Sequence, residues 1–430
     1  MSATSNGHGA ANPEAGAPDL LRLATAGSVD DGKSTLIGRL LFDSKLVFED
    51  QLEHVTETSK RRGDGYVNLA LLTDGLRAER EQGITIDVAY RYFATPKRRF
   101  IIADTPGHEQ YTRNMVTGAS TADLSVVLID ARNGVTSQSR RHASISSLLG
   151  IHHLVVCVNK MDLVDWDESV FKSVKADFQN VAEKLEVPDI TFIPISALNG
   201  DNVVDLSEAA PWYPGPALLD HLERVDVSRD RNLVDGRFPV QYVIRPMSDS
   251  HHDYRGYAGQ VASGVFRPGE EVVVLPSGKR THIAAIDTFD GEAKAAFPPM
   301  SVTLLLEDDV AVSRGDMIAH ADAAPEATRA LRATVCWMDD APLRAGAKLA
   351  VKLATKSVRA VVEDVCCRLD VETLDHDDDA DELGLNDMGT VELRLSSPLV
   401  ADPYVTNRGT GSFILIDEST NHTVGAGMVA

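Results

Sequence analysis

Cysteine is scarce in this sequence: there are four (Cys157, Cys336, Cys366 and Cys367), and no two of them form a C-x-x-C pair. This spacing favours neither a zinc site nor a disulfide framework. Long apolar runs are lacking as well, because no stretch approaches the about 18 residues that a membrane-spanning helix needs. Residues 1–19 are small, polar and rich in proline and glycine, without the apolar centre of a signal peptide. We therefore expect a cytoplasmic protein with no membrane partner.

Basic residues are also in short supply, with 42 lysines and arginines against 64 aspartates and glutamates and a formal net charge of −22. Such a balance opposes broad binding to nucleic acid, although it leaves room for a local basic patch. We therefore expect no nucleic-acid partner. What is present is a globular composition, with 43% hydrophobic residues in a chain of 430. At this length two or three domains are the expectation.

Residues 20–227 alternate apolar, β-prone runs with helical patterns, after a tail of 1–19 that we expect to be disordered. The alternation predicts an α/β domain, a mostly parallel sheet with helices on both faces. The turn Thr95–Arg98 predicts that the second and third strands form an antiparallel hairpin at one edge. The predicted strands are 21–25, 84–93, 99–103, 124–130, 153–158 and 190–195, and the predicted helices lie near 33–42, 108–118, 137–149, 168–186 and 216–224.

The pattern changes after residue 227 to short β-rich pieces divided by glycine and proline turns. One set of pieces falls in 228–325 and a second in 326–430, so we expect two further domains. The even spacing of the short strands predicts two small all-β domains, barrels or sandwiches.

The segment from Gly27 to Ser34 has the pattern G-x-x-x-x-G-K-[ST], between an apolar run and a helical pattern. Glycine lets the backbone wrap closely around a phosphate group, with successive N–H groups pointing inward. Lys33 is placed to reach the β- and γ-phosphates, and the Ser34 hydroxyl to bind Mg²⁺. An ordinary glycine-rich turn before a helix is the alternative. The residues expected around the phosphates are Gly27, Ser28, Val29, Asp30, Asp31, Gly32, Lys33, Ser34 and Thr35.

The run Asp104-Thr105-Pro106-Gly107-His108-Glu109 directly follows another apolar strand. An aspartate at the carboxyl end of a strand, across the sheet from the phosphate loop, can hold Mg²⁺ through a water. Gly107 offers an N–H to the γ-phosphate, and His108 is then placed to orient or deprotonate the attacking water. A plain turn explains Asp-Thr-Pro-Gly equally well in isolation.

Between these two loops lies Arg80-Glu81-Gln82-Gly83-Ile84-Thr85. A threonine entering a strand can complete the coordination of Mg²⁺ and bond the γ-phosphate through its N–H group, and so sense the third phosphate. A β-branched residue that simply begins a strand is the alternative. We expect Thr85, together with Lys33 and His108, to act in catalysis.

Two further segments follow apolar strands and predict the base site. The Asp162 carboxylate can accept two hydrogen bonds from guanine, and a site that leaves this carboxylate unpaired can reject adenine by ~10⁴ or more. Asn159 would brace the base pocket, and the Lys160 stem would cover the face of the base. In Ser196-Ala197-Leu198 the Ala197 N–H could meet guanine O6, although an ordinary loop explains this tripeptide by itself.

All five pieces occur in order, each at a strand end, which favours a GTP-hydrolysing switch domain that uses GTP and Mg²⁺. The chain resembles the translation-factor-like GTPases, the group that contains elongation factor Tu, and the resemblance implies that the two β-domains are its second and third barrels. His108 matches that family's water-positioning residue. Asp30 falls at its acidic loop position, with a role left open.

Within that group the chain is most similar to the GTPase (large) subunits of bacterial sulfate adenylyltransferases. The similar stretches are Leu72–Phe93, Ile102–Ser120 and Asn407–Asp417. The resemblance implies that GTP hydrolysis drives the formation of adenylyl sulfate and pyrophosphate from ATP and sulfate, at a site on a separate small subunit. A separate partner is consistent with the sequence of this chain, in which we find no second phosphate loop. The run Ser277–Arg280 is interpreted as a barrel turn.

Two rival functions remain open at this level. One is a translation factor that delivers aminoacyl-tRNA, which the acidic charge opposes. The other is a regulatory or scaffolding module that binds GTP without turnover, which the presence of Lys33, Thr85 and His108 opposes. The acidic run Asp375–Glu382 and the pair His251-His252 beside Asp253 are interpreted as solvated loops rather than metal sites.

Overall fold

The computed structural model describes residues 19–44, 49–62, 66–72, 85, 87–185, 187–246 and 254–430. Three sequence predictions fall outside these residues. They are the disordered tail, apart from Asp19, the Arg80–Ile84 part of the motif that ends at Thr85, and the exposed loop around His251 and His252.

The first sheet has the strand order β2-β3-β1-β4-β5-β6. β1 pairs in parallel with both β3 and β4, and the parallel pairing continues through β5 to β6. β2 is antiparallel to β3, which confirms the predicted edge hairpin. The strands are β1 (Asp19–Ala26), β2 (Ala89–Ala94), β3 (Arg98–Asp104), β4 (Leu124–Asp130), β5 (His153–Asn159) and β6 (Asp189–Pro194).

The predicted start of the second strand is wrong. β2 begins at Ala89, so Thr85 lies four positions before it and does not enter a strand. Asp87 forms a bend, and its carboxylate accepts the N–H of Val88 at 2.8 Å, so this N–H is bonded locally just before the strand. The predicted helix 108–118 is also corrected, because Tyr111 N donates to His108 O at 3.0 Å and makes its first turn a 3₁₀ helix.

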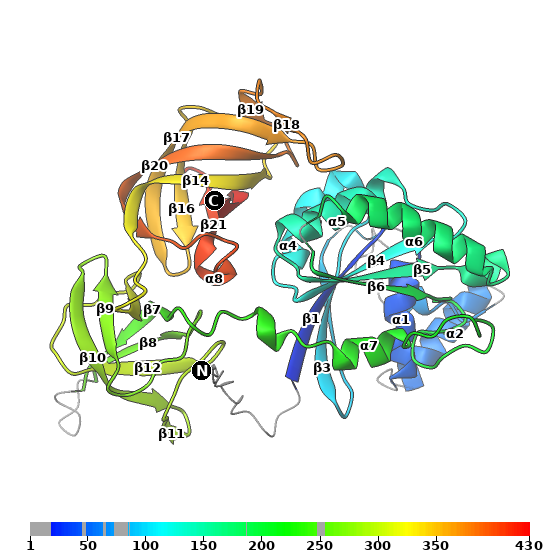
Figure 1. Ribbon diagram of the computed structural model, residues 1–430, viewed down its shortest axis with the longest axis horizontal. Helices are drawn as coiled ribbons and strands as arrows, with labels where there is room; N and C mark the ends of the chain where they lie inside the picture. The colour runs from blue at the N-terminus through cyan, green and yellow to red at the C-terminus, as the bar shows by residue number, and fades with distance from the viewer. Residues whose placement is uncertain are drawn as a thin grey trace, which may run out of the picture.

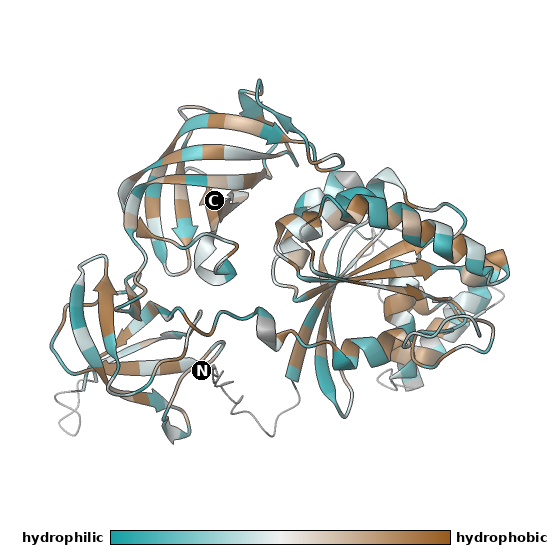
Figure 2. Cartoon of the chain, in the orientation of Figure 1, coloured by the Kyte–Doolittle hydropathy of each residue, from teal (hydrophilic) through white to brown (hydrophobic). Residues whose placement is uncertain are grey.

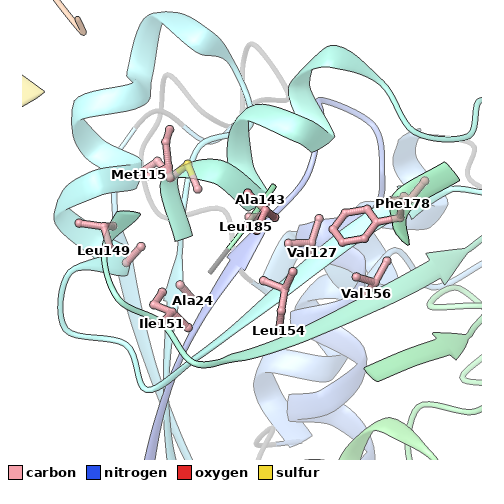
Figure 3. Packing of buried hydrophobic residues seen from close by; sticks show 14 of the residues in the cluster. Ala24, Met115, Val127, Ala143, Leu149, Ile151, Leu154, Val156, Phe178 and Leu185 are labelled. Carbon is pink, nitrogen blue, oxygen red and sulfur yellow. The ribbon is translucent and has the colours of Figure 1, made fainter. Parts of the chain in front are cut away.

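Helices cover both faces of this sheet (Figure 1). On one face α4, α5 and α6 pack through residues such as Met115, Ala143 and Phe178 against Val127 and Val156 of the strands (Figure 3). On the other face α1 and α7 pack through a separate cluster of buried leucines and isoleucines. The helices are α1 (Lys33–Asp43), α2 (Glu49–Arg62), α4 (Thr112–Ala119), α5 (Ser137–Leu148), α6 (Glu168–Ala182) and α7 (Leu218–Arg224), with 3₁₀ turns η1 (Leu69–Leu72), η2 (Glu109–Tyr111), η3 (Met161–Val164) and η4 (Ser228–Asp230).

The second sheet closes into a barrel. Its order is β11-β10-β12-β8-β7-β13-β9, and β10 pairs with β9 as well as with β12. The predicted turn Ser277–Arg280 joins β9 to β10, as the sequence indicated. The strands are β7 (Arg237–Ile244), β8 (Gly256–Gln260), β9 (Glu271–Leu275), β10 (Lys279–Thr288), β11 (Gly291–Glu292), β12 (Ser301–Leu306) and β13 (Met317–His320).

The third sheet closes in the same way, with the order β16-β21-β22-β14-β20-β17-β18 and a further pairing of β16 with β17. A separate two-stranded sheet is formed by β15 and β19. The elements of this whole domain are β14 (Ala327–Trp337), β15 (Leu343–Arg344), β16 (Lys348–Leu353), β17 (Lys356–Leu369), β18 (His376–Asp377), β19 (Glu382–Leu383), β20 (Met388–Val400), α8 (Arg408–Gly411), β21 (Ser412–Ile416) and β22 (Thr423–Val429).

The hydropathy of the strands follows these two architectures (Figure 2). The central strands of the first sheet are mostly hydrophobic. β4, for example, is buried along its whole length. The barrel strands alternate between buried and exposed residues, as along β10, because only one face of a barrel strand meets the core. The predicted fold class, an α/β domain followed by two β-barrels, is confirmed.

Buried contacts connect the three parts. The Arg237 guanidinium of the first barrel forms a bidentate pair with Asp402 of the second, with Nε 3.0 Å from Oδ2 and Nη2 2.9 Å from Oδ1. The Tyr404 hydroxyl donates to Leu149 O of the α/β domain at 2.8 Å. Trp337 belongs to the core of the second barrel, and its neighbour Met338 packs against the core of the α/β domain.

Two further sequence predictions concern metal binding by the acidic run and the lack of a membrane-spanning helix. Residues of the acidic run Asp375–Glu382 are mostly exposed, and the part of the chain that the structure describes contains no group of three metal-ligating side chains. Among the helices within the described ranges, none combines the length and the apolar character required to cross a bilayer.

Candidate functional site

The phosphate loop joins β1 to α1, and its glycines are required by its shape. Gly32 has φ 94° and stands immediately before α1, in the left-handed region that L side chains rarely adopt. A β-carbon on Gly32 would lie 2.5 Å from Nδ2 of Asn159. Inside the loop, Ser28 N donates to the Asp31 carboxylate at 2.5 Å. Burial raises the pKa of this carboxyl. Asp31 therefore braces the loop from behind.

Lys33 is held against the loop from which it emerges. Its side chain is 7% exposed, and its Nζ donates to Gly27 O at 2.8 Å and to Ser28 O at 2.9 Å. Burial lowers the pKa of the ammonium, an effect that the nearby carboxylates of Asp104 and Asp31 oppose. The result is a fixed cation beside the first turn of α1, where the backbone N–H groups have no partner within the helix.

Asp104 and Gly107 meet this loop from the neighbouring strand. Asp104 ends β3 and pairs across the sheet with Thr25 of β1, and its side chain is 2% exposed. A β-carbon on Gly107 would lie 2.3 Å from Lys33 Nζ and 2.5 Å from Gly27 O. The backbone at residue 107 therefore lies directly against the phosphate loop, at a position that admits no side chain.

His108 follows with an exposed side chain. Its Nδ1 accepts the N–H of Gln110 at 3.3 Å, and its ring lies edge-on to Tyr111, 6.2 Å between centroids. Because Nδ1 is the acceptor, the neutral ring carries its proton on Nε2.

The predicted base site is tied to the phosphate loop by two side chains. Asn159, the last residue of β5, donates from Nδ2 to Asp31 O at 2.7 Å. Its Oδ1 accepts the N–H of Ala197 at 2.9 Å, so a bond from this N–H to guanine O6 needs a shared or exchanged partner. Lys160 Nζ donates to Asp30 O at 2.5 Å. The two predicted halves of the site therefore form one connected structure.

One cavity of about 390 Å³ collects these segments. Four of the predicted residues, Gly27, Ser28, Asp31 and Asp104, do not line it. The predicted residues on its walls are Val29, Asp30, Gly32, Lys33, Ser34, Thr35, Thr85, Gly107, His108, Asn159, Lys160, Asp162, Ser196, Ala197 and Leu198.

Comparison with known proteins decides which family this arrangement belongs to. The profile of the family described as "Elongation factor Tu GTP binding domain" matches residues 19–220, and that of "GTP-eEF1A C-terminal domain-like" matches residues 330–430. The chain is 54% identical over 413 residues to "Sulfate adenylyltransferase subunit 1" of Alteromonas mediterranea, covering 96% of this chain and 87% of that protein.

The chain belongs to the sulfate adenylyltransferase subunit 1 family. Its first domain is accordingly a GTP-binding domain of the elongation factor Tu type, which confirms the predicted GTPase class. Similarity extends to the "Bifunctional enzyme CysN/CysC" of Mycobacterium tuberculosis, at 63% identity over 411 residues, covering 95% of this chain and 67% of that protein. The solved structure of sup35 complexed with GMPPNP aligns over 96% of this chain and 94% of that chain, at 23% identity and a TM-score of 0.44.

The oxygen donors that the sequence predicts for Mg²⁺ suit that ion. Ser34 and Thr85, which carry hydroxyl groups, line the cavity, and Asp104 is a buried carboxylic acid at the end of the neighbouring strand β3. Hydroxyl, carboxylate and water oxygens are the ligands that Mg²⁺ prefers, with substrate phosphates completing its coordination.

Three cavity residues are not among those that the sequence predicts: Tyr66, Arg132 and Leu163. Leu163 directly follows Asp162, so extending the predicted base segment by one residue would have included it. Arg132 stands two residues after β4, whose carboxyl end lies at the same edge as those of β1, β3 and β5; the rule that ligands bind at this edge would have found it. No sequence signal indicates Tyr66.

Proposed function

We propose that the chain binds GTP with Mg²⁺ in this cavity and hydrolyses it, as the GTPase subunit of a two-component sulfate adenylyltransferase. The observation that carries the proposal is the convergence of five separate sequence segments on one cavity. The same proposal includes the domain boundaries at 227 and 325 and the cytoplasmic location that the sequence predicts.

The phosphates would lie over the first turn of α1. Loop amides and the positive end of the helix dipole favour negative charge there. The Lys33 ammonium would exchange its two loop carbonyl partners for phosphate oxygens and stabilise the charge that develops as the γ-phosphoryl group departs. The Gly107 N–H would bond the γ-phosphate, since the backbone at this position lies against the loop.

Mg²⁺ would be held by Ser34 and Thr85, and by Asp104 through water. When bound, such an ion neutralises charge on the phosphate oxygens. His108 would align the attacking water. The Nδ1 hydrogen bond from Gln110 leaves the proton on Nε2, so the neutral ring acts by donating to the water and not by deprotonating it.

The base would lie between Lys160 and the Ser196–Leu198 loop, with the Asp162 carboxylate accepting from guanine N1–H and N2–H₂. Asn159 braces this pocket through Asp31 O and Ala197 N. An adenine base would leave the Asp162 carboxylate without these donors, which is the source of selectivity.

The proposed partner is a small subunit that carries the adenylyl-transfer site, where GTP hydrolysis drives formation of adenylyl sulfate from ATP and sulfate. The relatives named "subunit 1" support a heteromeric assembly. The rival function, delivery of aminoacyl-tRNA, is opposed by the net charge of −22 and by the 54% identity to a sulfate adenylyltransferase subunit.

The test combines the chain with its small subunit and measures pyrophosphate release from ATP and sulfate, alongside phosphate release from GTP. We expect stimulation by GTP and none by a non-hydrolysable analogue. Equal adenylyl sulfate formation without this chain would overturn the assembly role. An equal affinity for guanine and adenine nucleotides would overturn the assignment of the cavity itself.

A further inference from the structure

Asp130 and Arg132 lie outside every motif of the sequence, yet Arg132 lines the cavity and Asp130 contacts Lys160, which also lines it. Asp130 is the last residue of β4 and pairs across the sheet with Asn159, the last residue of β5. β4 therefore brings Asp130 to the edge where the phosphate loop and the base segment meet. Arg132, two residues later, lines the cavity itself.

Asp130 accepts four N–H donors although its side chain is only 2% exposed. Arg132 donates from Nη2 to Oδ2 at 2.6 Å, from Nε to Oδ1 at 3.0 Å, and from its backbone N–H to Oδ1 at 3.0 Å. The fourth donor is the Lys160 ammonium, 2.9 Å from Oδ2. The bidentate guanidinium fixes the plane of the carboxylate, and with it the direction in which Oδ2 meets Lys160.

Asp130 is a carboxylate at neutral pH. Burial by itself raises the pKa of its carboxyl, but the hydrogen bonds from Arg132 and Lys160 outweigh burial and hold the pKa below its ordinary value. A buried acid without such donors would take up a proton instead.

The Asp130 carboxylate holds the Lys160 ammonium in position through this hydrogen bond. The ammonium also donates to Asp30 O in the phosphate loop, so it lies between two fixed acceptors on opposite segments. A lysine has a flexible four-carbon stem, and two fixed acceptors at its end determine where the stem lies. Without Asp130, only the Asp30 carbonyl would hold the ammonium.

We infer that Asp130 is a positioning residue for guanine-nucleotide binding, which fixes Lys160 across the base segment and the phosphate loop, and that Arg132 fixes Asp130. The inference rests on the proposed function, because it concerns how tightly the GTP site holds its nucleotide. Lys160 serves the part of the site that GTP and GDP share. Loss of Asp130 should therefore weaken both nucleotides equally and leave the rate at saturating GTP unchanged.

The test is Asp130→Asn in the full chain, with fluorescent GDP and GTP analogues for binding and phosphate release for turnover. Asparagine keeps the shape of the side chain and removes its charge. We expect Kd for both nucleotides to rise at least about tenfold, through faster dissociation, with kcat within about twofold of wild type. Arg132→Lys keeps a positive charge but loses the bidentate geometry, so we expect a smaller rise in the same direction.

The matched control is Asp402→Asn, because Asp402 is also a buried aspartate with a bidentate arginine partner. This pair lies between the two barrels and does not line the nucleotide cavity. We expect Asp402→Asn to lower Tm without changing Kd. The inference is wrong if Asp130→Asn behaves like this control, or if it weakens GTP alone. A wild-type chain that binds no guanine nucleotide would overturn the proposed function and the inference with it; the wild-type measurement, made first, separates this failure from the others.

Discussion

Gly107 lies so close to Lys33 that a β-carbon on residue 107 would fall 2.3 Å from the lysine Nζ. Gly107→Ala must therefore displace the ammonium or the backbone that is expected to bond the γ-phosphate. We expect GTP hydrolysis to fall by at least about 100-fold, measured as phosphate release. The control is Gly384→Ala, where the nearest atom to a new β-carbon is 3.4 Å away. Near-normal turnover by Gly107→Ala would mean that this close packing has no part in catalysis.

We expect His108 to align the attacking water and to contribute little to the affinity for GTP. Its side chain is exposed, and His108→Ala removes no buried contact. Partner-stimulated GTP hydrolysis should fall by roughly 100-fold or more, while affinity for GTP stays within about twofold of wild type. His422→Ala, at another exposed histidine, provides the control. Undiminished hydrolysis by His108→Ala would contradict its assigned role.

Ser34→Ala tests the proposed metal ligand. The hydroxyl should matter only when Mg²⁺ is bound, so the variant should lose at least about tenfold in GTP affinity in the presence of Mg²⁺. After chelation with EDTA, wild type and variant should bind equally. A loss of the same size in EDTA would show that the hydroxyl contacts the nucleotide or the loop instead.

Asp402→Ala tests the connection between the barrels. It leaves the Arg237 guanidinium buried without its carboxylate, and removing one partner of a buried pair costs about 3–5 kcal/mol. We expect a clearly lower Tm by calorimetry and an unchanged affinity for GDP. Replacing both partners with apolar residues should recover much of the loss. A double variant no more stable than the single one would indicate that packing, not the unpaired charge, sets the cost.

His153 predicts a pH dependence of stability. Its Nε2 lies 3.1 Å from Asp230 and its Nδ1 2.8 Å from Asp189, and these two carboxylates, Asp230 first, raise the pKa of His153 to about 8. A raised histidine pKa stabilises the fold fully below the unfolded pKa of about 6.5. That contribution is lost as the pH rises through 8.

Between pH 6.5 and pH 9, stability should therefore fall by on the order of 1 kcal/mol. His153→Gln should flatten this part of a Tm-against-pH profile, whereas His422→Gln should leave it unchanged. An identical slope in wild type and His153→Gln would assign the pH dependence to other groups.

Local patterns carried most of the sequence prediction, because each motif is a short loop at the end of an apolar strand. Gly27–Ser34 and Asn159–Asp162 lie together because parallel strands present their carboxyl ends at one edge. Predictions failed where the structure depends on distant partners. Nothing near Asp130 in the sequence indicates that Lys160 will meet it, and Arg237 and Asp402 lie 165 positions apart. Thr85 lies before β2 and not in it, because β propensity alone does not indicate where pairing with the neighbouring strand begins.

The closure of the barrels restricts how another polypeptide can attach. Within the described residues, the barrel sheets expose only the two-residue strands β11 and β18 at their margins. The six-residue strands β2 and β6 end the first sheet. An incoming strand therefore finds its longest main-chain edges on the nucleotide-binding domain, whereas the edges on the barrels are two residues long and leave a partner there to rely mainly on side chains.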